Sequence, residues 1–116
     1  MDAYEVVAKC YNENNYEPLN DYLSEDCVYR SQWVFDEMRG RDKIVKHLIA
    51  KSETIAKHNA YPKAKIVRII SPQPQQAVAV SQGSAEIKTL VLLTTEEDKI
   101  KSIDICIPGL FTYEDE

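Results

Sequence analysis

Two nearby segments decide the fold: LNDYLSEDCVYRSQ at residues 19–32 and RGRDKIVKHL at residues 39–48. In the first segment an acidic turn leads into a stretch whose side chains sort with a period of two. In the second, a glycine stops this pattern, and apolar residues then recur three and four positions apart. A period of two is typical of a β-strand, and a period near 3.6 is typical of a helix. The two segments therefore predict a strand, a break and a helix.

The predicted strand runs from Cys27 to Phe35, and one of its faces is rich in aromatic residues. That face carries Cys27, Tyr29, Ser31, Trp33 and Phe35. The helix is predicted to begin near Asp42, a residue type that caps helices, and to end near Lys57. Its apolar face consists of Ile44, Val45, Leu48, Ile49 and Ile55.

Helices are also predicted before these segments, and strands after them. An apolar stripe predicts a helix over residues 2–14, and Pro18 suits the first turn of a short second helix. Turns rich in proline or charge then separate four predicted strands, at residues 64–70, 76–82, 85–93 and 100–107. We expect these strands to form an antiparallel meander, which gives an α+β fold class.

The bulk composition limits the class of function. The 116 residues are 44% hydrophobic and 28% charged, which is typical of one compact soluble domain spanning residues 1–116. No stretch is apolar enough to cross a bilayer, so we expect no membrane partner. The net charge is −5 and the basic residues form no cluster, so we expect no nucleic acid partner. The first residues lack the features of a secretory signal, which predicts a cytoplasmic protein.

The cysteines and histidines predict neither a disulfide nor a metal. Cys10, Cys27 and Cys106 are far apart and lie among apolar neighbours, so we expect reduced thiols that pack as small hydrophobic side chains. Neither histidine has a second histidine or an acidic residue at metal-ligand spacing. We therefore predict no metal and no cofactor.

The order helix, short helix, strand, helix and four strands resembles the nuclear-transport-factor-2-like superfamily, which includes ketosteroid isomerases and SnoaL-type polyketide cyclases. The two quoted segments carry the resemblance, because the family follows a helix, an acidic turn and a strand with Gly-(Lys/Arg)-(Asp/Glu)-x-Ile. The resemblance implies a cone: a curved antiparallel or mixed sheet wrapped around about three N-terminal helices, with an internal pocket. It also implies a homodimer. Such scaffolds carry many functions, so the fold alone assigns no reaction.

The resemblance to ketosteroid isomerases does not extend to their catalytic groups. Such a site implies a carboxylate base on the first strand and two oxyanion donors, a tyrosine and a protonated aspartic acid. In this chain Ser31 stands where the base is expected, Val7 near the tyrosine and Leu90 near the acid. A shift of one or two residues brings Tyr11 into the site but supplies no carboxylate.

The aromatic strand face predicts a binding site. Tyr29, Trp33 and Phe35, with the small polar Ser31 among them, have the composition of a pocket wall for a small apolar molecule. Tyr11 is a further candidate for this wall. The alternative is that the rings belong to the core, where aromatic residues supply much of the buried area.

Four ionisable residues are candidates for acid/base catalysis. Asp36 and Glu37 follow the aromatic face, His47 borders the apolar face of the helix, and Asp104 lies between isoleucines in the last predicted strand. Each has a structural alternative. These are a solvated loop for the acidic pair, simple packing for His47, and an ion pair across a dimer interface for Asp104.

Two leucines predict a covered outer surface. Leu90 and Leu92 share a strand face with charged residues, and Cys106 lies on the corresponding face of the last strand. Adjacent apolar side chains in the middle of a sheet are usually covered. We therefore predict a homodimer that buries these three residues, the alternative being a monomer with a modest apolar patch.

The sequence leaves three functions open. The first is binding of a small apolar molecule in the cone. The second is an enzyme of the same fold, an isomerase, dehydratase or cyclase that uses an acid/base residue. The third is a dimerisation or interaction module whose cone is filled by its own side chains.

Overall fold

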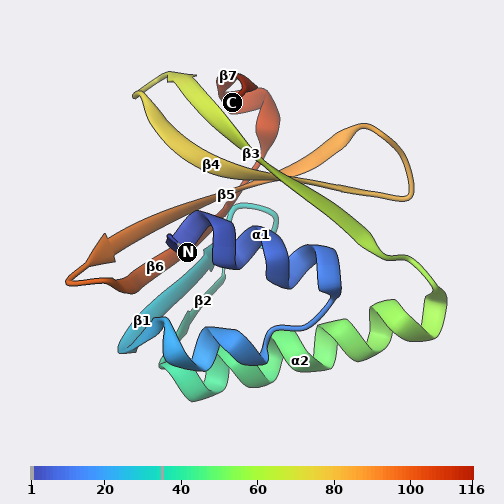
Figure 1. Cartoon of the computed structure of the whole chain (residues 1–116), viewed down its shortest axis with the longest axis vertical. Helices are drawn as coiled ribbons and strands as arrows, with labels where there is room; N and C mark the ends of the chain where they lie inside the picture. Colours follow the sequence, from blue (N-terminus) through green and yellow to red (C-terminus); the bar gives the residue numbers. More distant parts are fainter. Residues whose placement is uncertain (1, 35) are drawn as a thin grey trace.

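The computed structural model describes residues 2–34 and 36–116, which form a curved seven-stranded sheet with helices against one face (Figure 1). The helices are α1 (Ala3–Glu13), η1 (Glu17–Asp21), α2 (Arg41–His58) and η2 (Pro108–Leu110), of which η1 and η2 are 3₁₀-helices. The strands are β1 (Leu23–Ser31), β2 (Asp36–Arg39), β3 (Pro62–Ser71), β4 (Gln75–Gln82), β5 (Ile87–Glu96), β6 (Lys99–Cys106) and β7 (Thr112–Asp115). This confirms the predicted α+β fold. None of the described helices is long and apolar enough to cross a membrane.

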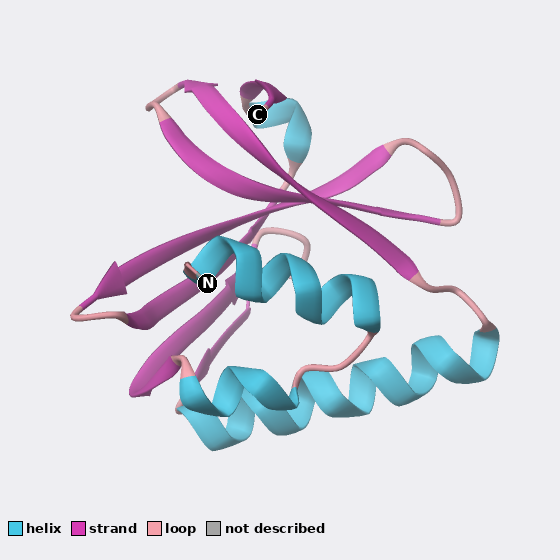
Figure 2. Cartoon of the chain, viewed as in Figure 1, coloured by secondary structure: helices cyan, strands magenta, loops and turns pink. Residues whose placement is uncertain are grey.

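The two α-helices begin and end at residues suited to those positions. Figure 2 shows α1 and α2 on one side of the strands, whereas the short η2 lies apart from them near the C-terminus. Asp2 caps α1, because its Oδ1 accepts a hydrogen bond of 2.9 Å from the Glu5 amide. Asn14 ends α1 in the left-handed conformation, with φ of 52°. α2 follows Gly40, whose φ of 102° favours glycine. The predicted cap Asp42 lies inside the first turn instead, and the predicted second helix is only the 3₁₀-helix η1.

The sheet is mixed, with strand order β2-β1-β6-β5-β4-β3-β7. β3, β4, β5 and β6 form the predicted antiparallel meander, and β1 pairs with β6 in parallel. The edge strands β2 and β7, of four residues each, were not predicted. Four residues hold too few alternating positions for a pattern to be recognised.

β1 ends at Ser31, so the predicted continuation of the strand through Trp33 is wrong. Polar side chains turn the backbone here. The Ser31 Oγ accepts a hydrogen bond of 3.2 Å from the Trp33 amide. Gln32 binds the backbone at the end of β6 through both its amide (2.9 Å) and its side-chain oxygen (2.8 Å). Phe35 lies outside the described residues.

Apolar side chains form one core on each face of the sheet. The inner core lies between the helices and the sheet and includes Val7, Leu19, Leu48, Val78, Val91 and Ile103. The smaller outer core consists of Val67, Ile69, Ala77, Ala79, Leu90 and Cys106. Phe111 and Tyr113 pack on this outer core, because the C-terminal segment crosses to the far edge of the sheet, where β7 pairs with β3 (Figure 1). The chain therefore covers part of its own outer face.

The residues predicted at a dimer interface lie on this outer face, as expected, but two of them are already buried. Leu90 is 0% and Cys106 is 4% exposed within the single chain. Leu92 keeps partial exposure at the border of the outer core. Burial by the chain itself removes the reason to expect a partner over Leu90 and Cys106.

The three cysteines are free and buried, in agreement with their predicted role as small hydrophobic side chains. Burial raises the pKa of each thiol to about 11. The thiols therefore stay protonated at neutral pH, the form that reacts slowly.

Asn12 protects the open edge of β3. β7 pairs with β3 only from Val67 onward, which leaves the first half of β3 without a neighbouring strand on that side. The Asn12 Oδ1 accepts a hydrogen bond from the Ala64 amide (2.7 Å), and its Nδ2 donates one to the Ala64 carbonyl (3.0 Å). Unpaired edges favour association with other strands. The side chain thus replaces a strand neighbour and fixes α1 against β3.

We expect Asn12→Ala to lower the free energy of unfolding by about 1–2 kcal/mol, because two hydrogen bonds are lost. The freed edge should also increase aggregation on heating. Urea denaturation and light scattering measure the two effects. Asn20→Ala is the control: it removes only one local hydrogen bond, of 3.2 Å to the Glu17 carbonyl within η1, and should change stability by less than about 0.5 kcal/mol. An Asn12→Ala protein as stable as the control would contradict this role.

Candidate functional site

Three tyrosines fill the deep part of the cone. Tyr11 comes from α1, Tyr16 from the loop before η1 and Tyr29 from β1, and each is at most 8% exposed. The rings of Tyr11 and Tyr16 meet edge to face, with centroids 5.5 Å apart and an interplanar angle of 89°. The cavity left among these rings and their apolar neighbours measures about 10 Å³. Such a volume holds one water molecule at most.

The turn after α1 directs Tyr16 into the cone. Asn14 adopts a left-handed backbone that most residue types disfavour. Its Nδ2 also donates a hydrogen bond of 2.9 Å to the Ser52 carbonyl, which ties the turn to α2. This turn lies two residues before Tyr16 and holds the start of the loop against α2.

Burial keeps the three phenols protonated. Desolvation raises the pKa of Tyr29 to about 12, and it raises the pKa values of Tyr11 and Tyr16 further above the ordinary value near 10. At neutral pH each hydroxyl is therefore available as a hydrogen-bond donor.

A second cavity, which we call the cone mouth, opens beside Tyr11 and Tyr16. Its volume is about 70 Å³, several times what one water molecule needs. Its apolar lining comes from Ile55, Pro62, Val80 and Ile105. Its polar lining comes from Tyr11, Tyr16, Lys51, Gln82, Lys88 and Thr89. The cone mouth thus sets hydroxyl, amide and ammonium groups beside an apolar wall.

The Tyr16 hydroxyl, like the Asn14 Oδ1 and the Ser24 Oγ, is buried without a hydrogen-bond partner among the described residues. Of these three residues, Tyr16 is the one that lines the cone mouth. Tyr16 is only 2% exposed, so a partner from outside the chain can reach this hydroxyl only at a cavity. Most buried polar side chains are bonded, and leaving one unpaired costs about 1–3 kcal/mol. Tyr16 lines the cone mouth, whose volume is large enough to hold a partner for this hydroxyl.

Lys51 is the cation at the cone mouth that has no ion pair within the described part of the chain. Although Lys51 is an exposed residue as a whole, the protein atoms around its amine lower its pKa by desolvation. Lys88, in contrast, binds the Glu86 carboxylate at 3.0 Å. The charge of Lys51 is therefore the one left uncompensated at this cavity.

The structure brings together two of the five predicted pocket residues. Tyr11 and Tyr29 both line the deep cavity. Ser31 instead borders a separate open hollow of about 350 Å³. Trp33 is 54% exposed in the turn after β1, and Phe35 lies outside the described residues. The aromatic wall expected from the strand alternation is therefore not formed by Trp33.

A sequence pattern could have identified Lys51 as a site residue, but no pattern identifies Tyr16. Lys51 follows Leu48 by three residues and precedes Ile55 by four, so it occupies an apolar position of α2. A lysine at such a position stands out from the pattern. Tyr16 lies in an irregular loop, where no periodicity tells which way a side chain points.

The described side chains of the predicted catalytic residues do not line the cone mouth. His47 is exposed on α2. Asp104 is paired on the outer face with Arg30, through hydrogen bonds of 2.7 and 3.3 Å. Glu37 is exposed in β2, the strand that begins at Asp36. The structure therefore does not assemble an acid/base pair from Glu37, His47 and Asp104.

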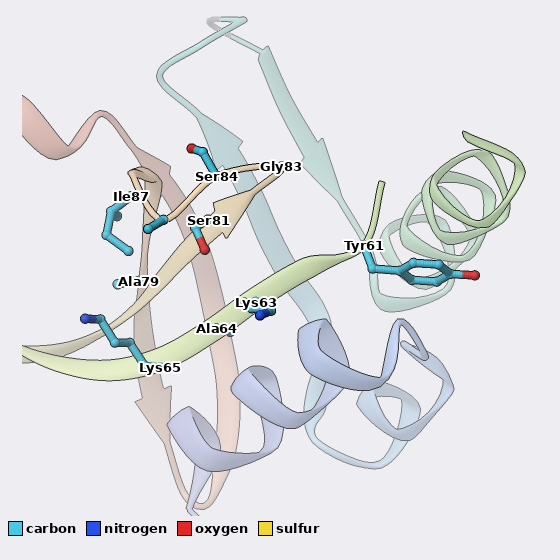
Figure 3. A pocket seen from close by; sticks show the side chains of 10 residues that line it. Tyr61, Lys63, Ala64, Lys65, Ala79, Ser81, Gly83, Ser84 and Ile87 are labelled. Atoms are coloured by element: carbon cyan, nitrogen blue, oxygen red, sulfur yellow. The ribbon is translucent and has the colours of Figure 1, made fainter. Parts of the chain in front are cut away.

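A hollow larger than the cone mouth is an open groove of about 600 Å³ on the outer face (Figure 3). It lies between β3, β4 and the loop before β5, where Ala79 and Ser81 form part of its lining. Lys63 and Lys65 border it, and the Tyr61 ring points away from the other labelled side chains (Figure 3). Small-molecule sites enclose most of their ligand. We therefore regard the groove as an outer surface and the cone mouth as the candidate ligand site.

Comparisons with known proteins identify the fold. No family model matches the chain, and no curated protein matches it. A SnoaL-like protein of unknown function from Burkholderia thailandensis aligns over 88% of each chain, with 8% identity and a TM-score of 0.65. An NTF2-like protein of unknown function from Cytophaga hutchinsonii aligns over 94% of this chain and 93% of its own, with 10% identity and a TM-score of 0.58.

An LEH-like epoxide hydrolase from M. tuberculosis also matches, over 90% of this chain and 75% of its own, with 14% identity and a TM-score of 0.60. Proteins of this shape thus include an enzyme and proteins without a known function, so the fold does not select an activity. The element order and the curved mixed sheet agree with these likenesses. The chain has the cone-shaped α+β fold of the NTF2-like and SnoaL-like proteins.

Proposed function

We propose that this chain binds a small polar molecule in the cone mouth. The observation that carries the proposal is the buried Tyr16 hydroxyl, which has no partner among the described residues and lies at a cavity of about 70 Å³. A phenylalanine would fill the same space without the cost of an unpaired hydroxyl, which is about 1–3 kcal/mol. A partner from outside the chain explains why a tyrosine stands there.

The proposed ligand is smaller and more polar than the apolar molecule expected from the sequence. Small-molecule pockets enclose roughly 300–1,000 Å³, whereas the deep cone leaves about 10 Å³. Tyr11, Tyr16 and Tyr29 occupy the space that an apolar ligand would need. The cone mouth adds about 70 Å³ bordered by polar groups. A ligand with a few non-hydrogen atoms, or the polar end of a larger one, fits this volume.

Binding is better supported than catalysis. General acid/base catalysis most often uses a histidine or a carboxylate, and less often a lysine or tyrosine, within hydrogen-bond reach of the substrate. Among the described residues that line the cone mouth, none is a histidine or a carboxylic acid. The tyrosines there can donate hydrogen bonds, but their raised pKa values keep them from acting as bases near pH 7. We therefore propose a binding protein rather than an isomerase, dehydratase or cyclase.

We expect Tyr16→Phe to raise the free energy of unfolding of the ligand-free protein by about 1 kcal/mol, because it removes an unpaired buried hydroxyl. Tyr4→Phe is the matched control. The Tyr4 hydroxyl donates a hydrogen bond of 3.2 Å to the Leu93 carbonyl, so its removal should lower stability by a similar amount. Urea denaturation compares the two. A loss of stability in Tyr16→Phe would mean that the hydroxyl is satisfied in the free protein.

The same pair of variants tests the function. In an NMR screen of small polar compounds, a ligand of the cone mouth should move the backbone amide signals of Lys51, Gln82 and Thr89. Tyr16→Phe should weaken binding, whereas Tyr4→Phe should bind as the wild type does. Trp33 is 54% exposed and lines neither cavity, so its fluorescence should not respond. A screen that leaves the three amide signals unmoved would contradict the proposed function.

Self-association as a homodimer is the second candidate function, and the filled deep cone favours this function. A cone occupied by its own tyrosines is what an interaction module would contain. The outer face offers the partly exposed Leu92 and an open groove lined in part by Ala79 and Ile87. A second copy on this face would cover apolar surface that one chain leaves open.

If the outer face forms a dimer, Leu92→Asp should convert it to a monomer, because an unpaired charge on a desolvated face is costly. Leu92 lies opposite Asp104 in the sheet, so the new carboxylate would also meet a like charge. Light scattering coupled to size exclusion gives the mass, and circular dichroism checks the fold. Lys57→Glu, on the exposed side of α2, is the control. A wild-type chain that remains monomeric at high concentration would exclude this function.

A further inference from the structure

We propose that the ligand of the cone mouth carries a carboxylate, which binds the Lys51 ammonium and the hydroxyls of Tyr11 and Tyr16. The inference rests on the function proposed above and adds the charge class of the ligand. It concerns the cavity of about 70 Å³ between α2, the end of α1 and strands β4 and β5. Three features of this cavity point to an anion: its charge, its donors and its size.

The charge of the cone mouth is positive. Two lysines line the cavity, and none of the described residues that line it is an aspartate or glutamate. Lys88 is compensated by Glu86 at 3.0 Å, whereas Lys51 has no ion pair in the described part of the chain. An oppositely charged group close to an ammonium favours its charged form. Since no described side chain supplies a negative charge to Lys51, we expect an anion from outside the chain to do so.

The environment of Lys51 supports the same conclusion. Desolvation is what lowers the pKa of this amine, and no nearby carboxylate acts in the opposite direction. A partly desolvated cation gains more from an anion than a fully hydrated one does, because the effective dielectric constant is lower. An arriving carboxylate would therefore be attracted more strongly here than at the other surface lysines of α2.

The hydroxyl groups provide the donors that a carboxylate needs. A carboxylate only accepts hydrogen bonds, and bonds to charged acceptors are roughly twice as strong as neutral ones. Tyr11 and Tyr16 are protonated phenols, and the Tyr16 hydroxyl is unused. The Gln82 side-chain amide already donates to the Ala60 carbonyl. The Tyr16 hydroxyl is thus a free donor, and Lys51, Tyr11 and Thr89 bring further donor groups to the same cavity.

The size of the cavity selects a small anion of single charge. About 70 Å³ accommodates a carboxylate with few attached atoms, compared with roughly 300 Å³ for the smallest drug-sized pockets. One uncompensated cation matches one negative charge, whereas a phosphate monoester carries nearly two near neutral pH. The geometry therefore favours a carboxylate over a phosphate.

The experiment is an NMR titration of the full chain at constant ionic strength. The probes are acetate, propanoate and butanoate, each paired with its uncharged amide: acetamide, propanamide and butanamide. Lys51→Met keeps the length of the side chain and removes its charge, and Lys51→Arg restores a charge. Lys46→Met, at an exposed position of the same helix, is the matched control. The amide spectrum of each variant shows whether it is folded.

The acids should move the amide signals of Gln82 and Thr89 and bind at least about tenfold more tightly than their amides, because a charged hydrogen bond is lost in the amides. Lys51→Met should bind the acids about tenfold more weakly or worse, and Lys51→Arg should recover part of the lost affinity. Lys46→Met should bind the acids as tightly as the wild type. If acids and amides bind equally well, and Tyr16→Phe weakens both, the ligand need not be a carboxylate but the proposed function stands. If neither class moves these signals, both proposals fail.

Discussion

The contact of Tyr16 with Tyr11 decides how much space the cone contains. The two rings meet edge to face at 5.5 Å, and Tyr29 completes the cluster from β1. Asn14, two residues before Tyr16, bends the backbone after α1 and binds the Ser52 carbonyl of α2. The ring cluster closes the deep cone, and the open volume is confined to the mouth, where polar groups gather. The size and the polarity of the proposed ligand both follow from this division.

The helices and strands that could be predicted are those whose buried apolar side chains recur at regular intervals along the sequence. The two quoted segments contain all of β1 and the start of α2, although the acidic stretch expected to be a turn is itself part of β1. The four later strands appear as the expected meander. The errors occur where single hydrogen bonds or local irregularities act. Ser31 and Gln32 end β1 by binding backbone groups. A bulge beside Val80 places Ile87 on the outer core, although simple alternation along β5 places it inside.

The candidate site was only partly predictable, for the same reason. Tyr11 and Tyr29 lie on periodic elements, and their direction into the cone follows from the pattern. Tyr16 lies in a loop, and its direction is set by tertiary contacts of Asn14 that no local pattern records. The sheet face on which Leu90 and Cys106 lie was also predictable, but the side chains that bury them there were not. It arises from Phe111 and Tyr113, which β7 places there by pairing with a strand more than 40 residues earlier in the chain.

Benzene binding tests most directly whether the cone is filled. Apolar cavities of roughly 150 Å³ bind benzene, whereas the deep cone leaves about 10 Å³. Leu48→Ala is the positive control, because Leu48 is 3% exposed beside the tyrosine cluster and its removal opens a cavity. In benzene-saturated buffer, we expect the ring signals of Tyr11 and Tyr29 to move in Leu48→Ala and to stay unchanged in the wild type. Equal shifts in the wild type would show that the cone is hollow and would contradict the proposed division between a filled interior and a polar mouth.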